Sequence, residues 1–292
     1  MRGEGLNEEV DINRGSFRRS GCSSMLEVSQ FKDSVTCIKT ASPLGGQAIM
    51  WVYAYHINDV VFDAGCANAI EELRAYKHTK PVNRVVVTHN HEDHFGGCSA
   101  FLPEADVFAG PVTLKSVHEP YQLPEFFGFV WGQPPPVKQA RYLDESTIVA
   151  GDFQFEVLDL SGHCKEMIGF WEPEQRWLFS ADAVPLPSCK QMAMPEENIP
   201  KMIMRMKEIR DMHVEVLFDG HRGPIEKPQE HIDTRIMFLS ELHQQIQQMA
   251  DEGKSLVEIK EVLGFPEPWY LPNTENRFAV DHLIRSLLED TV

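Results

Sequence analysis

The chain has 292 residues, 42% of them hydrophobic and 24% charged, which is typical of a globular protein with one large core or a core and a smaller domain. Its formal net charge of −17 argues against a general nucleic-acid binder, because phosphate contacts need a basic surface. No apolar run approaches the roughly 18 residues that span a bilayer, and residues 1–24 lack the apolar centre of a secretory signal. We therefore expect a cytoplasmic protein that acts on a small molecule, with neither nucleic acid nor membrane as a partner.

The N-terminal 24 residues and the cysteines add two expectations. The polar composition of residues 1–24 predicts a disordered leader, with Met25 as an alternative start. The six cysteines contain no C-x-x-C pair and are too dilute for a disulfide scaffold, so we expect reduced thiols. Cys98 and Cys164 lie near candidate ligands described below, where we expect them to fill space.

Strand-like and helix-like segments interleave along the first half of the chain. A β-hairpin is predicted first, then a helix, a buried strand, a short strand and a second helix. Their ranges are residues 49–57 with 60–63, residues 67–78, residues 84–88, residues 105–109 and residues 111–117.

Residues 121–138 form an unusual aromatic passage. They contain Phe126, Phe127, Phe129 and Trp131, followed by three consecutive prolines. This composition favours an irregular but ordered insertion over a strand or helix. It is interpreted either as a hydrophobic cluster beneath a loop or as a lid over an apolar substrate pocket.

The second half predicts more strands and then only helices. Strands are expected at residues 148–149, 153–160, 167–171, 176–180 and 214–218, the last being the final strand, with a helix over 194–211 interrupted near Pro200. From residue 229 onward the pattern is helical, in about three segments. Strands followed by helices in each half predict an α/β fold of two sheets packed face to face with helices outside. We expect a domain over residues 25–228 and a helical extension over 229–292. The extension is interpreted as packing on the core or on a second subunit in a homodimer, or as shaping the substrate pocket.

One short segment carries three imidazoles and a carboxylate within six residues. His89, His91, Asp93 and His94 directly follow the apolar run at residues 85–87. Such side chains are costly to bury unless they are paired or bound to metal, and together they suit zinc, iron or manganese. His89 and His91 can point the same way from extended backbone, whereas Asp93 and His94 fall at the start of a helix. One loop could thus serve two metals.

Three further polar residues follow apolar strands. His163 comes after the strand at 153–160, Asp182 closes the strand at 176–180, and His221 follows the strand at 214–218. Taken singly, each is explained by a turn, but together with the first cluster they make a metal site more probable than coincidence. The seven residues are candidate ligands.

The order H-x-H-x-D-H, Gly-His, Asp after a strand and Gly-His resembles the metallo-β-lactamase superfamily over roughly residues 35–224, and within it the hydroxyacylglutathione hydrolase (glyoxalase II)-like group. The resemblance implies an αββα sandwich with a dinuclear site at its edge. His89, His91 and His163 would then bind one metal, Asp93, His94 and His221 the other, and Asp182 would bridge them. Asp63 resembles the early Asp-x-Gly motif and would support the ligand loop, although it could also be a simple turn residue.

The resemblance also implies the chemistry. Two divalent ions, zinc first and iron or manganese as alternatives, would bind a bridging hydroxide that cleaves an ester, thioester or lactone, with Asp93 orienting it. The lactamase role is disfavoured because Asp182 stands where the common dizinc enzymes have cysteine. A phosphodiesterase and a mononuclear-iron oxidoreductase resembling persulfide dioxygenase stay open as alternatives. Phe126, Phe127, Phe129 and Trp131 are candidate pocket residues.

Overall fold

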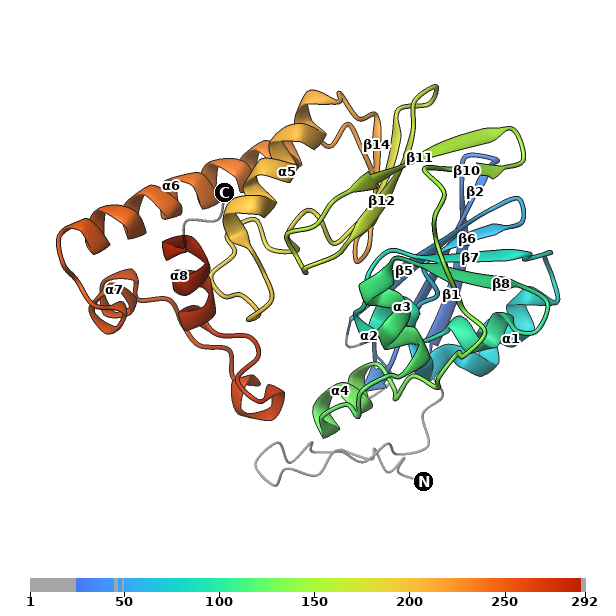
Figure 1. Ribbon diagram of the computed structural model, residues 1–292, viewed down its shortest axis with the longest axis horizontal. Coiled ribbons are helices and arrows are strands. Elements are labelled where there is room, and N and C mark those ends of the chain that lie inside the picture. The colour runs from blue at the N-terminus through green and yellow to red at the C-terminus, as the bar shows by residue number, and fades with distance from the viewer. Residues whose placement is uncertain (1–24, 45–46, 49, 290–292) are drawn as a thin grey trace, which may run out of the picture.

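The computed structural model describes residues 25–44, 47–48 and 50–289, so the leader expected at residues 1–24 lies outside the described part. Two mixed sheets pack face to face, and helices cover both outer faces (Figure 1). This arrangement confirms the αββα sandwich expected from the sequence.

The first sheet has seven strands in the order β1-β2-β5-β6-β7-β8-β9. Neighbours from β1 to β6 pair antiparallel, whereas β6, β7, β8 and β9 are parallel. The strands are β1 (Met25–Phe31), β2 (Val35–Ala41), β5 (Val52–Ile57), β6 (Val60–Phe62), β7 (Arg84–Val87), β8 (Asp106–Ala109) and β9 (Arg141–Tyr142), and β3 (Pro43–Leu44) pairs apart with β4 (Gln47–Ala48).

The second sheet has six strands in sequence order. Its pairs are antiparallel except for β13 and β14, which are parallel. The strands are β10 (Thr147–Ala150), β11 (Phe153–Asp159), β12 (Ile168–Glu172), β13 (Trp177–Ala181), β14 (Val216–Asp219) and β15 (Gly223–Glu226). Because β12 is antiparallel to both β11 and β13, strands β11, β13 and β14 all end at the same edge.

An aromatic core joins the two sheets. Phe62 from the first sheet contacts Phe155, Phe170 and Phe179 from the second, with ring centroids 4.3 to 5.2 Å apart. All four side chains are at most 2% exposed. Aromatic burial of this size is a large part of the hydrophobic free energy of folding. The stacked sheets therefore form a rigid base for the loops at their edge.

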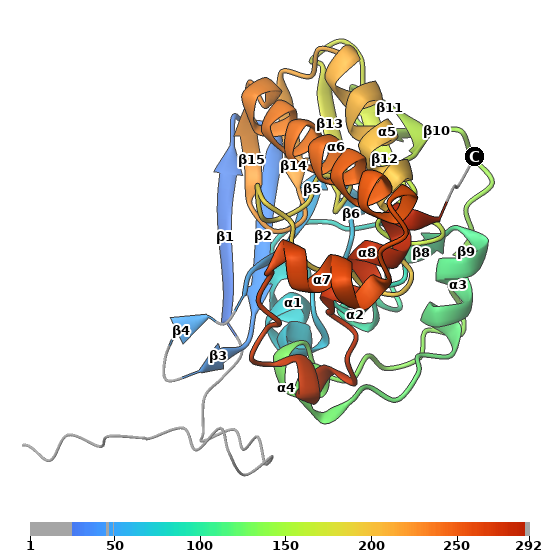
Figure 2. The same cartoon turned by 90° about the vertical axis from the view of Figure 1, so that its left-hand side faces the viewer.

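Helices pack on each outer face. On the first sheet lie α1 (Ile70–Lys77), α2 (Glu92–Phe95), α3 (Pro111–His118) and α4 (Glu125–Val130). On the second lie α5 (Ile199–Asp211) and α6 (Gln229–Asp251). Helix α8 (Val280–Leu288) packs on α5 and α6, and α7 (Leu256–Leu263) packs on α6 and α8. Figure 2 shows α6 in front of the second sheet, with α7 and α8 below it, as the helical pattern from residue 229 predicts.

Three local predictions were wrong. The insertion at 121–138 contains the short helix α4, because residues 125–130 place Phe127 and Val130 together on a buried face. Pro200 does not interrupt a helix: it lies in the first turn of α5, where its missing N–H costs nothing, so residues 194–198 are irregular. The final strand is β15, which follows a turn at Gly220.

Among the described helices, none combines the length and the hydropathy that a bilayer crossing requires. The cytoplasmic location, the domain boundary near residue 229 and the homodimer stay predictions.

Candidate metal centre

All seven candidate ligands lie at one edge of the sandwich. His163, Asp182 and His221 follow β11, β13 and β14, whose carboxyl ends meet there. The ligand loop, residues 88–97, follows β7 in the other sheet. A backbone bridge between His89 and Met167 joins the two sheets at this point. The topology thus brings together side chains that are up to 132 residues apart, from His89 to His221.

The ligand loop is held by backbone contacts. His91 has extended backbone just before α2, so Asp93 and His94 lie in that helix's single turn. The Thr88 N–H and hydroxyl both donate to Asp63, and the Ala64 N–H donates to the His94 carbonyl. Gly97 is required because a Cβ there would lie 2.1 Å from the Ala64 carbonyl oxygen. The loop therefore has little freedom to relax.

The side-chain atoms converge in three overlapping groups of mutually close ligand atoms. Each group fits within 4.8 Å and shares residues with its neighbours. The groups are His89 with His91 and His163, His89 with His94 and Asp182, and Asp93 with His94 and His221.

Asp182 lies at the centre of these groups. Its Oδ1 is 3.5 Å from His94 Nε2, and its Oδ2 is 3.4 Å from His163 Nε2 and 3.3 Å from His221 Nε2. Its carboxylate thus faces ligands that the family resemblance assigns to two different metals. This is the position that a bridging carboxylate needs.

Several of these atoms are buried with no hydrogen-bond partner among the described residues. They are His89 Nε2, His94 Nε2 and Asp182 Oδ1. An unsatisfied buried polar atom costs about 1–3 kcal/mol, so such a cluster needs a compensating ligand. Imidazole nitrogens and carboxylate oxygens are donors that suit zinc, iron and manganese. The residues therefore fit a divalent metal.

The far nitrogens of the histidines are fixed by separate partners. His94 Nδ1 lies 2.8 Å from Asp63 Oδ2, and His221 Nδ1 lies 2.8 Å from the Trp51 carbonyl. His89 Nδ1 lies 2.9 Å from the Thr88 hydroxyl. Such partners orient a ring and select its tautomer, leaving Nε2 to face the centre.

The carboxylates and imidazoles of the cluster shift one another's pKa values. Burial raises the pKa of Asp182, whereas the His221 and His94 imidazoles lower it. Together the imidazoles outweigh burial, so this pKa lies well below its ordinary range. Burial opposes protonation of His221, but the Asp182 and Asp93 carboxylates raise its pKa to about 9. His89 differs: burial and the neighbouring imidazoles hold its pKa well below its ordinary value. A metal ion bound by His221 would have to displace this proton, so its binding would release protons.

Gly220 gives the cluster its close packing. A Cβ at this position would lie 2.3 Å from Asp182 Oδ1 and 2.9 Å from His94 Cε1. Any other residue would push one of these two side chains away. The Gly-His step thus has a steric reason besides the turn.

Two glutamates contact candidate ligands, although no sequence motif pointed to them. Glu197 Oε1 is 3.0 Å from His163 Nδ1, and Glu196 Oε1 is 3.4 Å from His91 Nε2. Glu197 is fully buried. Burial raises its pKa, but Lys190 and His163 bring it down to about 2, so it is a carboxylate at neutral pH. Arg277 from the C-terminal extension is 2.5 Å from Glu196.

The aromatic insertion borders the cluster. The Trp131 ring lies 6.3 Å from the His221 ring between centroids. Phe127 packs on Phe278, and Phe126 stacks on Tyr270, both from the extension. Phe129 is partly buried against the core of the first sheet. Of the four candidate pocket residues, Trp131 is thus the one with a ring contact to a ligand.

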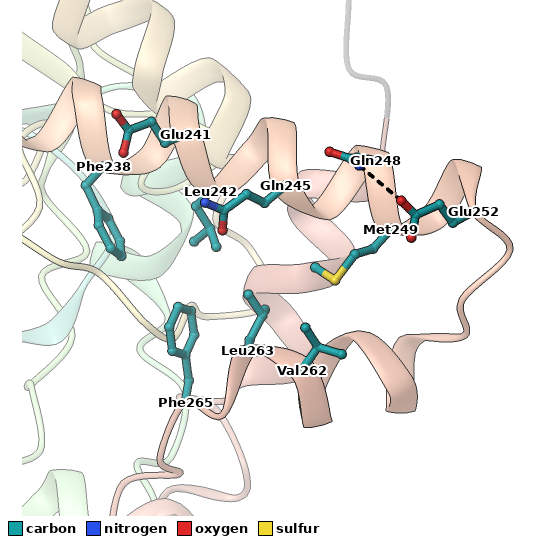
Figure 3. Close-up of a pocket in the computed structure, with 10 residues that line it drawn as sticks. All are labelled: Phe238, Glu241, Leu242, Gln245, Gln248, Met249, Glu252, Val262, Leu263 and Phe265. Atoms are coloured by element: carbon teal, nitrogen blue, oxygen red, sulfur yellow. Dashed lines mark hydrogen bonds between the residues drawn. The ribbon is translucent and has the colours of Figure 1, made fainter.

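A hollow of about 520 Å³ lies elsewhere, between α6 and α7 (Figure 3). Phe238, Leu242, Met249 and Phe265 line it, with glutamates and glutamines on its rim. None of its lining residues belongs to the metal cluster or to the aromatic insertion.

Comparison with known proteins agrees with this geometry. Residues 50–222, more than half of the chain, match the metallo-beta-lactamase superfamily. A hydroxyacylglutathione hydrolase of Bdellovibrio bacteriovorus is 27% identical over 128 residues, which cover 43% of each protein. An acyl-coenzyme A thioesterase of Gallus gallus is 27% identical over 204 residues, covering 61% of this chain and 73% of that protein. The chain thus spans less than half the length of the first of these relatives.

Solved structures support the fold. A metallo-beta-lactamase from Pontibacter korlensis superposes with a TM-score of 0.58 at 18% identity, covering 74% of this chain and 99% of that one. An inverting sec-alkylsulfatase from Pseudomonas superposes with a TM-score of 0.62 at 14% identity, covering 90% of this chain and 50% of that one. The superfamily is mostly hydrolytic and typically binds divalent metals. With its matched domain, its sandwich fold and its cluster of histidines and aspartates, the chain belongs to the metallo-β-lactamase superfamily.

Proposed function

We propose that this protein is a dinuclear metal-dependent hydrolase of acyl esters, with an acyl thioester as the favoured substrate and a lactone as the next. The observation that carries the proposal is Asp182, whose carboxylate lies between the two sets of ligands. The names of the two relatives support an acyl thioester, since one is a hydrolase of a hydroxyacylglutathione and the other an acyl-coenzyme A thioesterase.

The ligand set divides into two parts. His89, His91 and His163 would hold one ion, with zinc favoured and iron or manganese as alternatives. Asp93, His94 and His221 would hold the other, and Asp182 would contact both. When bound, such a pair of ions lowers the pKa of water and stabilises negative charge on a carbonyl oxygen.

The remaining steps fall to side chains of this chain. Asp93 is buried, and its Oδ2 lies 3.5 Å from His221 Nε2. In this proposal its carboxylate accepts a hydrogen bond from the attacking water and takes its proton. Asp182 and the histidine rings, held by the contacts described above, would keep the positions of the groups around that water constant. Trp131, beside His221, supplies an apolar surface that excludes bulk water from one side.

An activity panel on protein of measured metal content tests the proposal. Acyl thioesters of coenzyme A and of glutathione, lactones and phosphodiesters are compared at equal metal occupancy. We expect two metal ions per chain and thioester hydrolysis faster than phosphodiester hydrolysis. One iron per chain together with oxygen consumption on glutathione persulfide would overturn it, as would hydrolysis of phosphodiesters alone.

A further inference from the structure

Two consecutive glutamates stand behind two ligands of the same proposed ion. Glu197 Oε1 contacts His163 Nδ1 at 3.0 Å, and Glu196 Oε1 lies 3.4 Å from His91 Nε2. The inward atoms of these two rings, His91 Nδ1 and His163 Nε2, lie 3.0 Å apart. Each glutamate thus faces the outer nitrogen of a ring whose other nitrogen points toward its partner ligand.

Each glutamate is itself held by a cation. Lys190 Nζ lies 2.9 Å from Glu197 Oε2, and Arg277 Nη2 lies 2.5 Å from Glu196 Oε1. The second arm of Arg277 donates to the Tyr121 hydroxyl at 3.0 Å. A carboxylate fixed by a cation has fewer ways to rotate away from its imidazole.

The backbone around the glutamates is anchored by the C-terminal extension. Ala193 and Ala279 exchange two backbone hydrogen bonds of 3.1 Å. The Ser286 hydroxyl of α8 donates to the Glu197 carbonyl and accepts from the Ile199 N–H, each at 2.8 Å. With Arg277, the extension therefore holds this segment at three points.

The segment is also tied to the loop of His163. The Asn198 N–H donates to the Gly162 carbonyl at 2.7 Å, and the Met194 N–H donates to Glu197 Oε2 at 2.9 Å. A shift of α8 would thus move the glutamates and the His163 loop together.

We propose that Glu196 and Glu197 are positioning residues that orient His91 and His163, and that the C-terminal extension, through Arg277 and Ser286, sets the metal affinity of that side of the centre. This inference rests on the proposed metal site. The opposite side is supported differently, by Asp63 behind His94 and by the Trp51 carbonyl behind His221. The two sides should therefore respond to different substitutions.

The test is a competition titration of metal-free full-length protein with Zn²⁺ and a chromophoric chelator, which resolves two binding constants. The variants are Glu197→Gln, Glu196→Gln and Arg277→Met. Asp63→Asn serves as the variant for the opposite side. Glu172→Gln is the matched control, because Glu172 is equally buried but caps a turn between β12 and β13, with no contact to a ligand.

We expect each glutamate variant and Arg277→Met to weaken one binding constant by roughly 10- to 100-fold and to leave the other within about threefold. Asp63→Asn should weaken the other constant, and combining it with Glu197→Gln should weaken both. Arg277→Lys should restore part of the affinity. The unfolding temperature of each metal-free variant shows whether a loss comes from misfolding, and Arg277→Met, whose side chain is partly exposed, carries the test if Glu197→Gln does not fold.

Unchanged constants in the glutamate and arginine variants, or equal weakening of both constants, would overturn the inference. If wild-type protein binds no second ion, the proposed dinuclear function fails instead. The two failures are thus distinguishable in one experiment.

Discussion

The ligand loop at residues 88–97 and the wall beside it border the same cluster but are built differently. The wall consists of residues 121–131, which include α4, and residues 269–278, and aromatic rings of the two segments contact one another. Every ligand in the loop is buried, and its backbone is tied to Asp63 and Ala64. In the wall, by contrast, Trp269 is 65% exposed and Tyr121, just before α4, is 43% exposed.

This difference separates two tasks. A buried loop with fixed partners can hold charged ligands in one geometry, which hydrolysis needs. A wall of aromatic contacts can change its shape at little cost to the ligands, which suits the choice of acyl group. We expect substitutions in the loop to act on metal content and turnover, and those in the wall to act on substrate preference.

The largest expected effect is that of Asp182→Ala. Losing the carboxylate between the two ligand sets should reduce both turnover and metal content. The loss of turnover should exceed roughly 100-fold, the upper range for a residue that only hydrogen-bonds to a metal ligand. Asp152→Ala, in the β10–β11 hairpin at the opposite end of β11, is the control. Full activity of Asp182→Ala at wild-type metal occupancy would contradict the dinuclear assignment.

Gly220→Ala should be next in size. The added Cβ meets Asp182 Oδ1 at 2.3 Å, so the carboxylate must move, and a displacement near 1 Å can cost on the order of 100-fold in turnover. Gly128→Ala is the control, because it makes the same substitution at a position where an added Cβ meets nothing within 4 Å. Steady-state kinetics of both variants measure this. Equal kinetics would show that the cluster tolerates movement.

Substitutions in the wall should have a smaller and different effect. Trp131→Phe shrinks the surface beside His221, and Phe127→Leu loosens the packing on Phe278. Hydrophobic contacts of this size discriminate by about 10-fold, so we expect the ratio of rates for long and short acyl thioesters to change by that factor. Metal content should stay at wild-type level. An unchanged acyl preference in both variants would remove the role of the wall in substrate choice.

The smallest effect is expected for the alkylation of the buried thiols near the ligands. Burial raises the pKa of Cys66 to about 11 and of Cys164 to about 12, and it raises that of Cys98 further, so all three are protonated at pH 8. Cys189 is exposed. In a Cys22→Ser variant, iodoacetamide at pH 8 should modify one thiol per folded chain by mass spectrometry. Equally fast modification of Cys66 or Cys98 would mean that the loop opens.

Much of the site could be predicted because its chemistry is concentrated in sequence. His89, His91, Asp93 and His94 are unusual as neighbours, so local pattern alone marks them. His163, Asp182 and His221 each follow an apolar strand, which a turn explains singly, and they stand out only together with the first cluster. The sandwich follows for the same reason, since alternating strands and helices have few ways to pack.

The supporting residues could not be predicted because their contacts are distant and ordinary in type. Glu196 meets Arg277 across 81 residues, and Glu197 meets His163 across 34. Glutamates beside a helix start are common on solvated surfaces, so the sequence gives no sign that Glu197 is buried. The start of α5 was also hard to predict from Pro200. Proline interrupts a helix when it lies in the interior but is favoured in the first turn, and the sequence alone does not distinguish the two positions.

The most direct measurement is anomalous diffraction at the metal edge from crystals of the metal-loaded protein. We predict two peaks about 3.5–4 Å apart, one beside His89, His91 and His163 and the other beside Asp93, His94 and His221, with Asp182 between them. A single peak at full occupancy, or two peaks that Asp182 does not contact, would contradict a dinuclear hydrolytic centre.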